Sequence, residues 1–169
     1  MKKIVFVVAP QNFRDEEYIE PKKILEDAGF HVVTASTVVG EIYGKIKIKA
    51  NSDILVKNIN PDDYDAIFFI GGPGASIYFN DGFVHNLIKL FLNAGKIVSA
   101  ICIAPTILAN AGILKGKNAT VFSDGAEALI KGGANYTAKN VEIDGNILTG
   151  DGPQSAKEFA QTLIKLLNK

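Results

Sequence analysis

Cys102 is the only cysteine of this 169-residue chain, and it stands where a buried strand is followed by a helix. The residues before it, 97–101, are small or apolar and uncharged, which is typical of a strand covered on both faces. Pro105 fits a first-turn position of the helix, where its missing N–H costs nothing. A thiol at a helix start faces free N–H groups and the positive end of the dipole, which favour the thiolate. A nucleophilic cysteine is therefore one interpretation, but on this stretch alone a small core side chain is the more common role of a lone cysteine in an apolar run.

A glycine-rich turn and a run of carboxylates are candidates to complete such a site. Gly71-Gly72-Pro73-Gly74 follows a strand, and its free N–H groups could hold a phosphate or a developing oxyanion. It matches neither a Walker A loop nor GxGxxG. Asp15, Glu16 and Glu17 stand at a helix start, where acidic residues are also expected from the dipole alone. A carboxyl in a partly apolar pocket beside the thiol would have a raised pKa and could donate a proton to it.

The two histidines, His31 and His85, show neither HxH nor HExxH spacing, and one cysteine cannot form a cysteine-based metal cluster. We therefore predict no metal site and regard both histidines as surface or packing residues. Because Ile103 follows Cys102, a local Cys-His pair is absent.

The elements that must position these residues alternate between strand and helix, which indicates a mostly parallel sheet covered on both faces. Strands are predicted at residues 4–9, 31–36, 66–70, 97–101 and 119–122, and helices at 16–28, 83–92, 126–130 and 153–167, with one more after Cys102. Asp144-Gly145 predicts an antiparallel hairpin at the margin. Alternating apolar residues and lysines over 43–49 predict an edge strand or a half-exposed hairpin.

In sheets of this kind, ligands bind beyond the carboxyl ends of the strands. The loops after Ala9, Ile70 and Ile101 qualify by this rule. We therefore expect Glu16 and Glu17, the Gly71-Gly72 turn and Cys102 at one end of the sheet.

Composition sets the broad class. The 18 basic and 18 acidic residues balance without a long block of one sign, and 47% of the residues are hydrophobic. We expect one domain over residues 1–169, with neither nucleic acid nor an anionic membrane as a partner. No apolar segment approaches transmembrane length, and the short apolar run after Met1 stops at Pro10 without a signal-peptide cleavage site. A cytoplasmic location is therefore expected, in a compartment that keeps thiols reduced.

Several motifs together resemble the ThiJ/PfpI superfamily over essentially the full chain. They are residues 100–106 (AICIAPT), the Gly71-Gly72 pair, and Glu17 four residues before Pro21. The C-terminal segments 141–149 (VEIDGNILT), 152–153 (GP) and 158–160 (EFA) are similar to the branch that contains the parkinsonism-associated protein deglycase.

The resemblance implies a flavodoxin-like α/β/α sandwich, a nucleophile elbow at the cysteine, and commonly a homodimer. It implies that Cys102 is the nucleophile and an oxidation-sensitive thiol, and that Glu17 contacts its sulfur. The backbone N–H groups of Gly72 and Ile103 would form the oxyanion hole. The remaining pocket residues would be Gly71, Pro73, Gly152 and Pro153.

The chain departs from the family pattern at three places. The PfpI protease branch has a histidine directly after the cysteine, where this chain has Ile103, and this counts against proteolysis. The deglycase branch often has a basic residue before its Gly-Pro, where this chain has Asp151. It also often has a histidine where Val121 or Phe122 falls.

Three functions follow from the resemblance. The first is a glyoxalase- or deglycase-like enzyme that acts without metal or organic cofactor on small α-oxoaldehydes or glycated adducts. The second is a redox sensor or chaperone in which Cys102 oxidises to the sulfinate. The third is a PfpI-type peptidase or amidase, related to the class I glutamine amidotransferase-like proteins. A protein that keeps the fold with weak or lost activity is a further alternative.

Overall fold

The computed structural model describes residues 1–169 and is built around a seven-stranded sheet. In spatial order the strands are β11 (Val141–Asp144), β12 (Ile147–Gly150), β8 (Ile97–Ile101), β7 (Ala66–Phe69), β1 (Lys3–Val7), β3 (His31–Ser36) and β6 (Ile54–Leu55). Neighbouring strands are parallel except for β11, which pairs antiparallel with β12 through the predicted hairpin. The predicted α/β class is confirmed.

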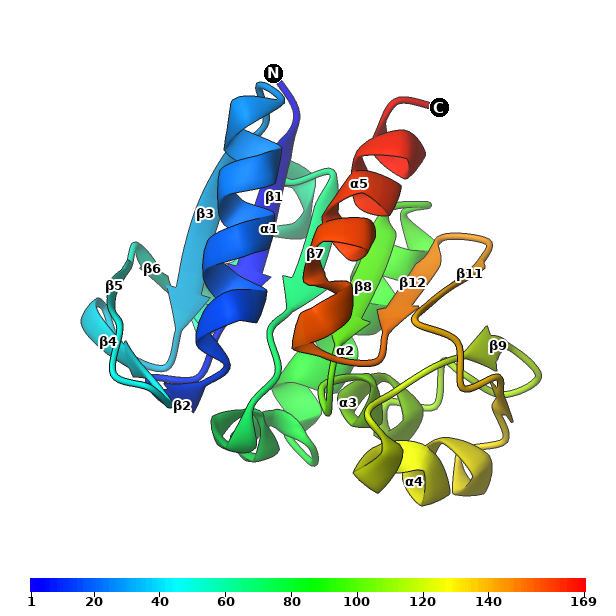
Figure 1. Ribbon diagram of the computed structural model, residues 1–169. Helices are drawn as coiled ribbons and strands as arrows, with labels where there is room; N and C mark the ends of the chain where they lie inside the picture. Colours follow the sequence, from blue (N-terminus) through cyan, green and yellow to red (C-terminus); the bar gives the residue numbers. More distant parts are fainter.

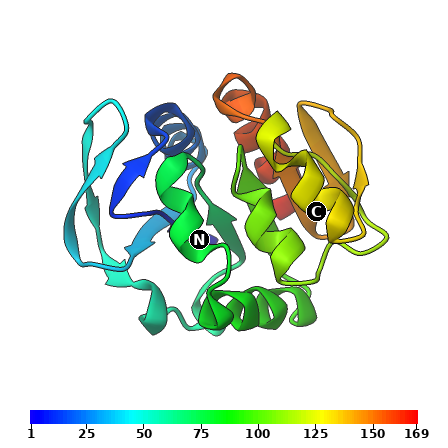
Figure 2. The ribbon, with the colours of Figure 1, turned by 90° about the horizontal axis from the view of Figure 1, so that it is seen from below.

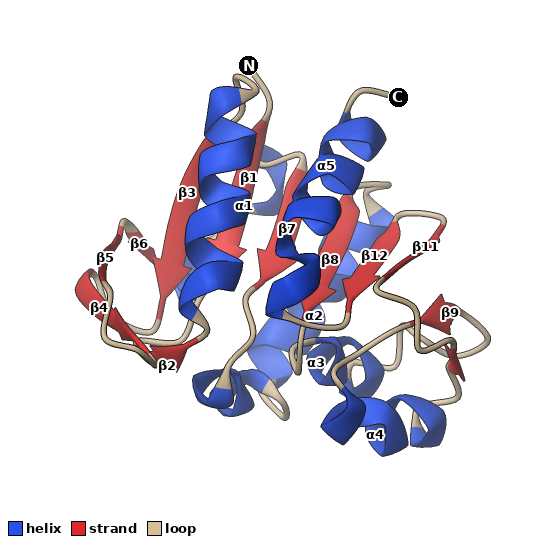
Figure 3. Cartoon of the chain, in the orientation of Figure 1, coloured by secondary structure: helices blue, strands red, loops and turns tan.

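Helices cover both faces of this sheet (Figures 1 and 3). Ile4 and Phe6 of β1 pack in one apolar cluster with α1 (Asp15–Asp27) and α5 (Ala156–Leu167). Val5 and Val7 point to the opposite face, where the other cluster includes α2 (Gly82–Asn93) and α3 (Pro105–Asn110). Because both faces are buried, the strands are continuously apolar and do not alternate with polar residues.

Smaller elements gather at the carboxyl end of the main strands, the end that faces the viewer in Figure 2. On one side, β2 (Gln11–Phe13), β4 (Gly40–Gly44) and β5 (Lys49–Ser52) form a three-stranded sheet. On the other side lie α4 (Ala126–Lys131) and the short pair of β9 (Asn118–Ala119) with β10 (Asn135–Tyr136). The 3₁₀ helices are Val56–Asn58, Pro61–Asp63, Pro73–Tyr78, Ser123–Gly125 and Pro153–Ser155.

The lysine-rich segment forms the predicted hairpin, but its turn falls inside the stretch that the alternation assigned to a strand. The chain turns between Gly44 and Lys49, and the Asp15 carboxylate accepts the backbone N–H groups of Ile46 (3.0 Å) and Ile48 (3.2 Å). Gly44 is required beside this carboxylate, because a Cβ there would overlap it. A tertiary contact from α1 therefore fixes the turn, and the local pattern could not reveal it.

Two other predicted boundaries are wrong. The strand expected at 119–122 ends at Ala119, because the Phe122 N–H donates to the Cys102 carbonyl (2.7 Å) instead of continuing the β9 pairing. The C-terminal helix begins with a 3₁₀ turn at Pro153 and becomes α-helical at Ala156. The structure contains no helix long and apolar enough to cross a membrane.

Candidate functional site

Cys102 lies at a sharp corner directly after β8. Its backbone has φ +61°, in the left-handed region that costs a non-glycine residue roughly 1–2 kcal/mol. Two hydrogen bonds hold it there: its N–H donates to Gly150 of β12 (2.9 Å), and its carbonyl accepts from Phe122. Cys102 is 9% exposed as a whole residue. A strained, externally clamped residue of this kind is typical of a functional position.

Glu17 lies behind the cysteine, in the first turn of α1, and is completely buried. Its Oε2 accepts the Gly71 N–H at 3.0 Å, whereas no donor meets the distance and angle of a hydrogen bond at its Oε1. Gly71 makes this approach possible, because a Cβ on it would lie 2.6 Å from both the Cys102 Cβ and Glu17 Oε2. The structure therefore brings Cys102, Glu17 and the glycine turn together.

The charges of Cys102 and Glu17 are coupled. Burial raises the pKa of the Glu17 carboxyl to about 7, against hydrogen bonds from Cys102 and Gly71 that favour the carboxylate. Burial, followed by the adjacent Glu17 charge, raises the pKa of the Cys102 thiol to about 12. Between these pKa values the pair holds one proton and one negative charge.

The raised Glu17 pKa agrees with the sequence prediction, but the prediction that a helix start by itself favours the thiolate is wrong. The helix after the cysteine, α3, has only six residues, and the pKa of the thiol is raised chiefly by burial. Glu17 and the N–H groups near the sulfur, rather than the helix start, therefore determine where the negative charge of the pair lies.

Two backbone N–H groups act on the charge of the Cys102 thiol. Those of Gly72 and Ile103 lower its pKa, and neither donates to a backbone carbonyl. Gly72 has φ +96°, and a Cβ on it would collide with the backbone at Asn12–Arg14. These are the two N–H groups predicted for the oxyanion hole, and that role stays a prediction.

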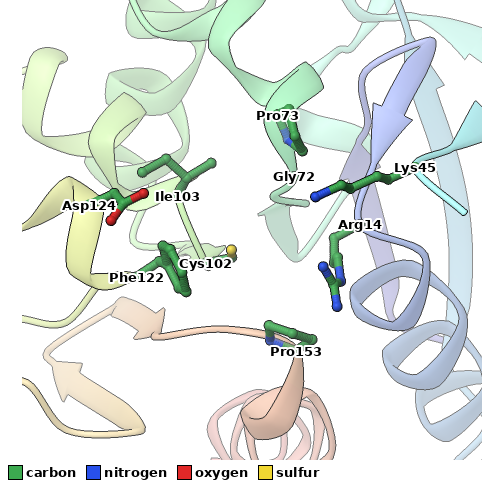
Figure 4. A pocket seen from close by; sticks show the side chains of 9 residues that line it. All are labelled: Arg14, Lys45, Gly72, Pro73, Cys102, Ile103, Phe122, Asp124 and Pro153. Atoms are coloured by element: carbon green, nitrogen blue, oxygen red, sulfur yellow. The ribbon is translucent and has the colours of Figure 1, made fainter.

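The sulfur opens into a cavity of about 480 Å³ (Figure 4). Its lining residues are Arg14, Lys45, Gly72, Pro73, Cys102, Ile103, Phe122, Asp124 and Pro153. Of the predicted pocket residues, Pro73 and Pro153 line it, whereas Gly71 does not and packs against Glu17 and Cys102. Glu17, predicted as a catalytic residue, does not line the cavity. Gly152 lines an adjoining hollow with Phe122, Asp151, Pro153 and Gln154.

Sequence reasoning missed four lining residues: Arg14, Lys45, Phe122 and Asp124. Arg14 could have been found, because it lies between β2 and α1, in the connection after Ala9 that was predicted at the ligand-binding end. Lys45 lies in the stretch predicted as an edge strand or a hairpin, and it reaches the cavity because the chain turns there. Phe122 was noted only as the place of a family histidine. Asp124, in a 3₁₀ turn before α4, gave no signal.

Neither histidine belongs to the site. His85 hydrogen-bonds the Phe79 carbonyl through Nε2 (2.9 Å), His31 begins β3, and neither lines the cavity. Nowhere do three or more His, Cys, Asp or Glu side chains gather as they would around a metal ion.

Comparison with known proteins gives a consistent family match. The DJ-1/PfpI family model matches residues 2–166. An uncharacterised protein of Methanocaldococcus jannaschii is 42% identical, covering 99% of this chain and 83% of its own. A deglycase of Pyrococcus abyssi is 31% identical over 96% of this chain and 98% of its own. A Bacillus subtilis protein, whose name provisionally calls it a cysteine protease, is 32% identical over 99% of both chains.

Solved structures agree with the fold. A ThiJ/PfpI domain protein from Brachyspira murdochii superposes with a TM-score of 0.96 at 40% identity, covering 98% of this chain and 96% of its own. DJ-1beta of Drosophila melanogaster superposes with a TM-score of 0.90 at 27% identity, covering 98% and 90%.

Proposed function

This chain belongs to the DJ-1/PfpI family, and on that premise we propose that it is a cysteine-dependent enzyme acting on reactive α-oxoaldehydes or their adducts. The observation that carries the proposal is the position of Cys102: it lines the cavity with a strained backbone and lies beside the buried Glu17 carboxyl, whose pKa burial raises to about 7. The deglycase name of the Pyrococcus abyssi relative supports the same chemistry.

In the proposed reaction, Sγ of Cys102 adds to the aldehyde carbon while the C=O electron pair moves to oxygen. The N–H groups of Gly72 and Ile103 stabilise that oxygen, and the proton of the pair neutralises it to give a hemithioacetal. Glu17 then moves a proton from the former aldehyde carbon to the adjacent carbon through an enediol. The product is a thioester of an α-hydroxy acid. Water hydrolyses it and restores the thiol, so no external oxidant or reductant is consumed.

The cysteine substitution tests this function directly. We expect Cys102→Ala to lower the conversion of methylglyoxal to lactate by at least about a thousandfold, because the nucleophile is removed. Near-ultraviolet circular dichroism of the variant should match the native chain, since the site opens to a cavity and alanine fits there. Full lactate production by the folded variant would contradict the proposal.

The peptidase alternative is less favoured. A Cys-His mechanism needs a histidine within reach of the sulfur, and the cavity lining contains none. Ile103 occupies the position directly after the cysteine.

A redox role is the second candidate, and one observation favours it. The same N–H groups and the Glu17 carboxyl that surround Sγ would hold the oxygens of a sulfinate. Mass spectrometry after graded peroxide tests this role. We expect a selective two-oxygen adduct on the Cys102 peptide, and we expect Glu17→Asp to lower its yield. An unmodified peptide would contradict the redox role.

We further propose a cytoplasmic homodimer of single-domain chains. In support, the β4–β5 hairpin and the loop before it expose the apolar side chains of Val39, Tyr43 and Ile46. Sedimentation equilibrium should give twice the mass of the chain, and a monomer at micromolar concentration would contradict it.

A further inference from the structure

The cavity in front of Cys102 has an uneven charge distribution. Arg14 and Lys45 lie together on the side toward which the sulfur points, and Asp124 lies on the opposite side beyond Ile103 (Figure 4). Two cations and one anion therefore line the cavity, and the cations share one wall.

The two cations are held at the cavity by their backbones. The Arg14 N–H donates to the Gly71 carbonyl (2.9 Å), and the Lys45 N–H donates to the Phe13 carbonyl (2.8 Å). Arg14 pairs with Glu16 through Nε only (2.9 Å), which leaves its terminal nitrogens for a ligand. Lys45 makes no ion pair.

Such an arrangement is needed if the substrate is an anion. The Cys102–Glu17 pair carries one negative charge when it is reactive, and this charge repels an anionic substrate. Two cations across the cavity offset that repulsion and attract an anionic group away from the sulfur. Asp151, the acidic residue at the other end of the site, hydrogen-bonds Ser155 and lines the adjoining hollow instead.

We propose that Arg14 and Lys45 form an anion subsite that selects carbonyl compounds carrying a carboxylate beyond the reacting carbonyl. This inference rests on the proposed function for the carbonyl chemistry, but the subsite has its own test. The two side chains determine specificity and take no part in bond making.

Alkylation of Cys102 by a matched pair of reagents measures the charge of the cavity. Iodoacetate and iodoacetamide each form an S–C bond with loss of iodide and differ chiefly in one negative charge. We expect Lys45→Gln to lower the iodoacetate rate by about fivefold, as removal of one nearby, partly solvated charge should. The iodoacetamide rate should change less than about twofold, and added salt should shrink the difference. Arg14→Gln should act in the same direction.

Lys47→Gln is the matched control, because Lys45 and Lys47 lie in the same turn and border the same neighbouring hollow, but only Lys45 also lines the cavity. It should leave both rates unchanged, and Asp124→Asn should raise the iodoacetate rate. An iodoacetate-to-iodoacetamide ratio that neither Lys45→Gln nor Arg14→Gln alters would overturn the subsite, as would an equal effect of Lys47→Gln.

Turnover separates the subsite from the proposed function. The native chain should have a higher kcat/KM for 4,5-dioxopentanoate, an α-oxoaldehyde with a terminal carboxylate, than for its neutral methyl ester. Lys45→Gln should lower this ratio of kcat/KM values by about fivefold. Turnover of neither compound, with the alkylation ratio still dependent on Lys45, would refute the enzyme and keep the anion site. Turnover of both with equal kcat/KM in the native chain would refute the substrate class alone.

Discussion

Asp15 and Glu17 lie two residues apart at the start of α1, and both are almost inaccessible, at 1% and 0% exposure. Both oxygens of Asp15 accept backbone N–H groups of the β4–β5 turn. Glu17 accepts one N–H, from Gly71, and its other oxygen has no ordinary partner. Equal burial therefore has opposite consequences: a fully hydrogen-bonded carboxylate stabilises a turn, whereas an incompletely bonded one is left ready to exchange a proton with the thiol.

Among the three acidic residues at the start of α1, Glu17 should have the largest effect, and that effect is on catalysis. Glu17→Gln keeps an oxygen for the Gly71 N–H but cannot move a proton, so we expect kcat/KM for methylglyoxal to fall by about a hundredfold or more. In the native chain, activity should rise with pH through about 7, as the pair loses its first proton. The variant should lack this limb. A pH profile that keeps it would assign the limb to another group.

The next largest effect is on stability, and its sign is opposite to that on activity. The pKa of Glu17 is raised from 4.5 to about 7 in the folded chain, so its contribution is complete below pH 4.5 and is lost as the pH rises through about 7. The loss is on the order of 3 kcal/mol. Urea unfolding at pH 8 should therefore find Glu17→Gln more stable than the native chain, with little difference at pH 4. Equal stability of the variant and the native chain at both pH values would show that burial does not destabilise the Glu17 carboxylate.

Asp15→Ala should behave in the opposite way. It leaves the N–H groups of Ile46 and Ile48 without their acceptor, and we expect a loss of about 2 kcal/mol in the free energy of unfolding. The iodoacetamide rate at Cys102 should stay within about threefold, because Glu17 and the glycine turn are untouched. A large loss of thiol reactivity with no loss of stability would reverse the roles assigned to the two carboxylates.

Glu16, between the two, should matter least. Its ion pair with Arg14 is about one-third exposed on both sides, so Glu16→Gln should change the free energy of unfolding by less than about 0.5 kcal/mol. The same urea titrations measure it. A loss as large as that of Asp15→Ala would mean that the whole acidic run acts as one network.

Much of the fold was predictable because it depends on local pattern. Largely apolar runs marked β1, β7 and β8, and Asp144-Gly145 marked the β11–β12 hairpin. The very short strands β2 and β10 were not predicted, since two or three residues carry no periodicity. Their pairing depends on partners distant in the sequence.

The candidate site divides in the same way. The sequence by itself placed Cys102, Glu17 and Gly71-Gly72 at one end of a parallel sheet, because the strand order along the chain forces those loops to meet there. Only the tertiary structure decided which of three adjacent carboxylates faces the sulfur, that burial raises the pKa of the thiol, and that Arg14 and Lys45 share the opposite wall. Burial and long-range contacts are properties of the packed molecule, and neighbouring residues of one helical turn with the same chemistry differ only in what the rest of the chain brings against them.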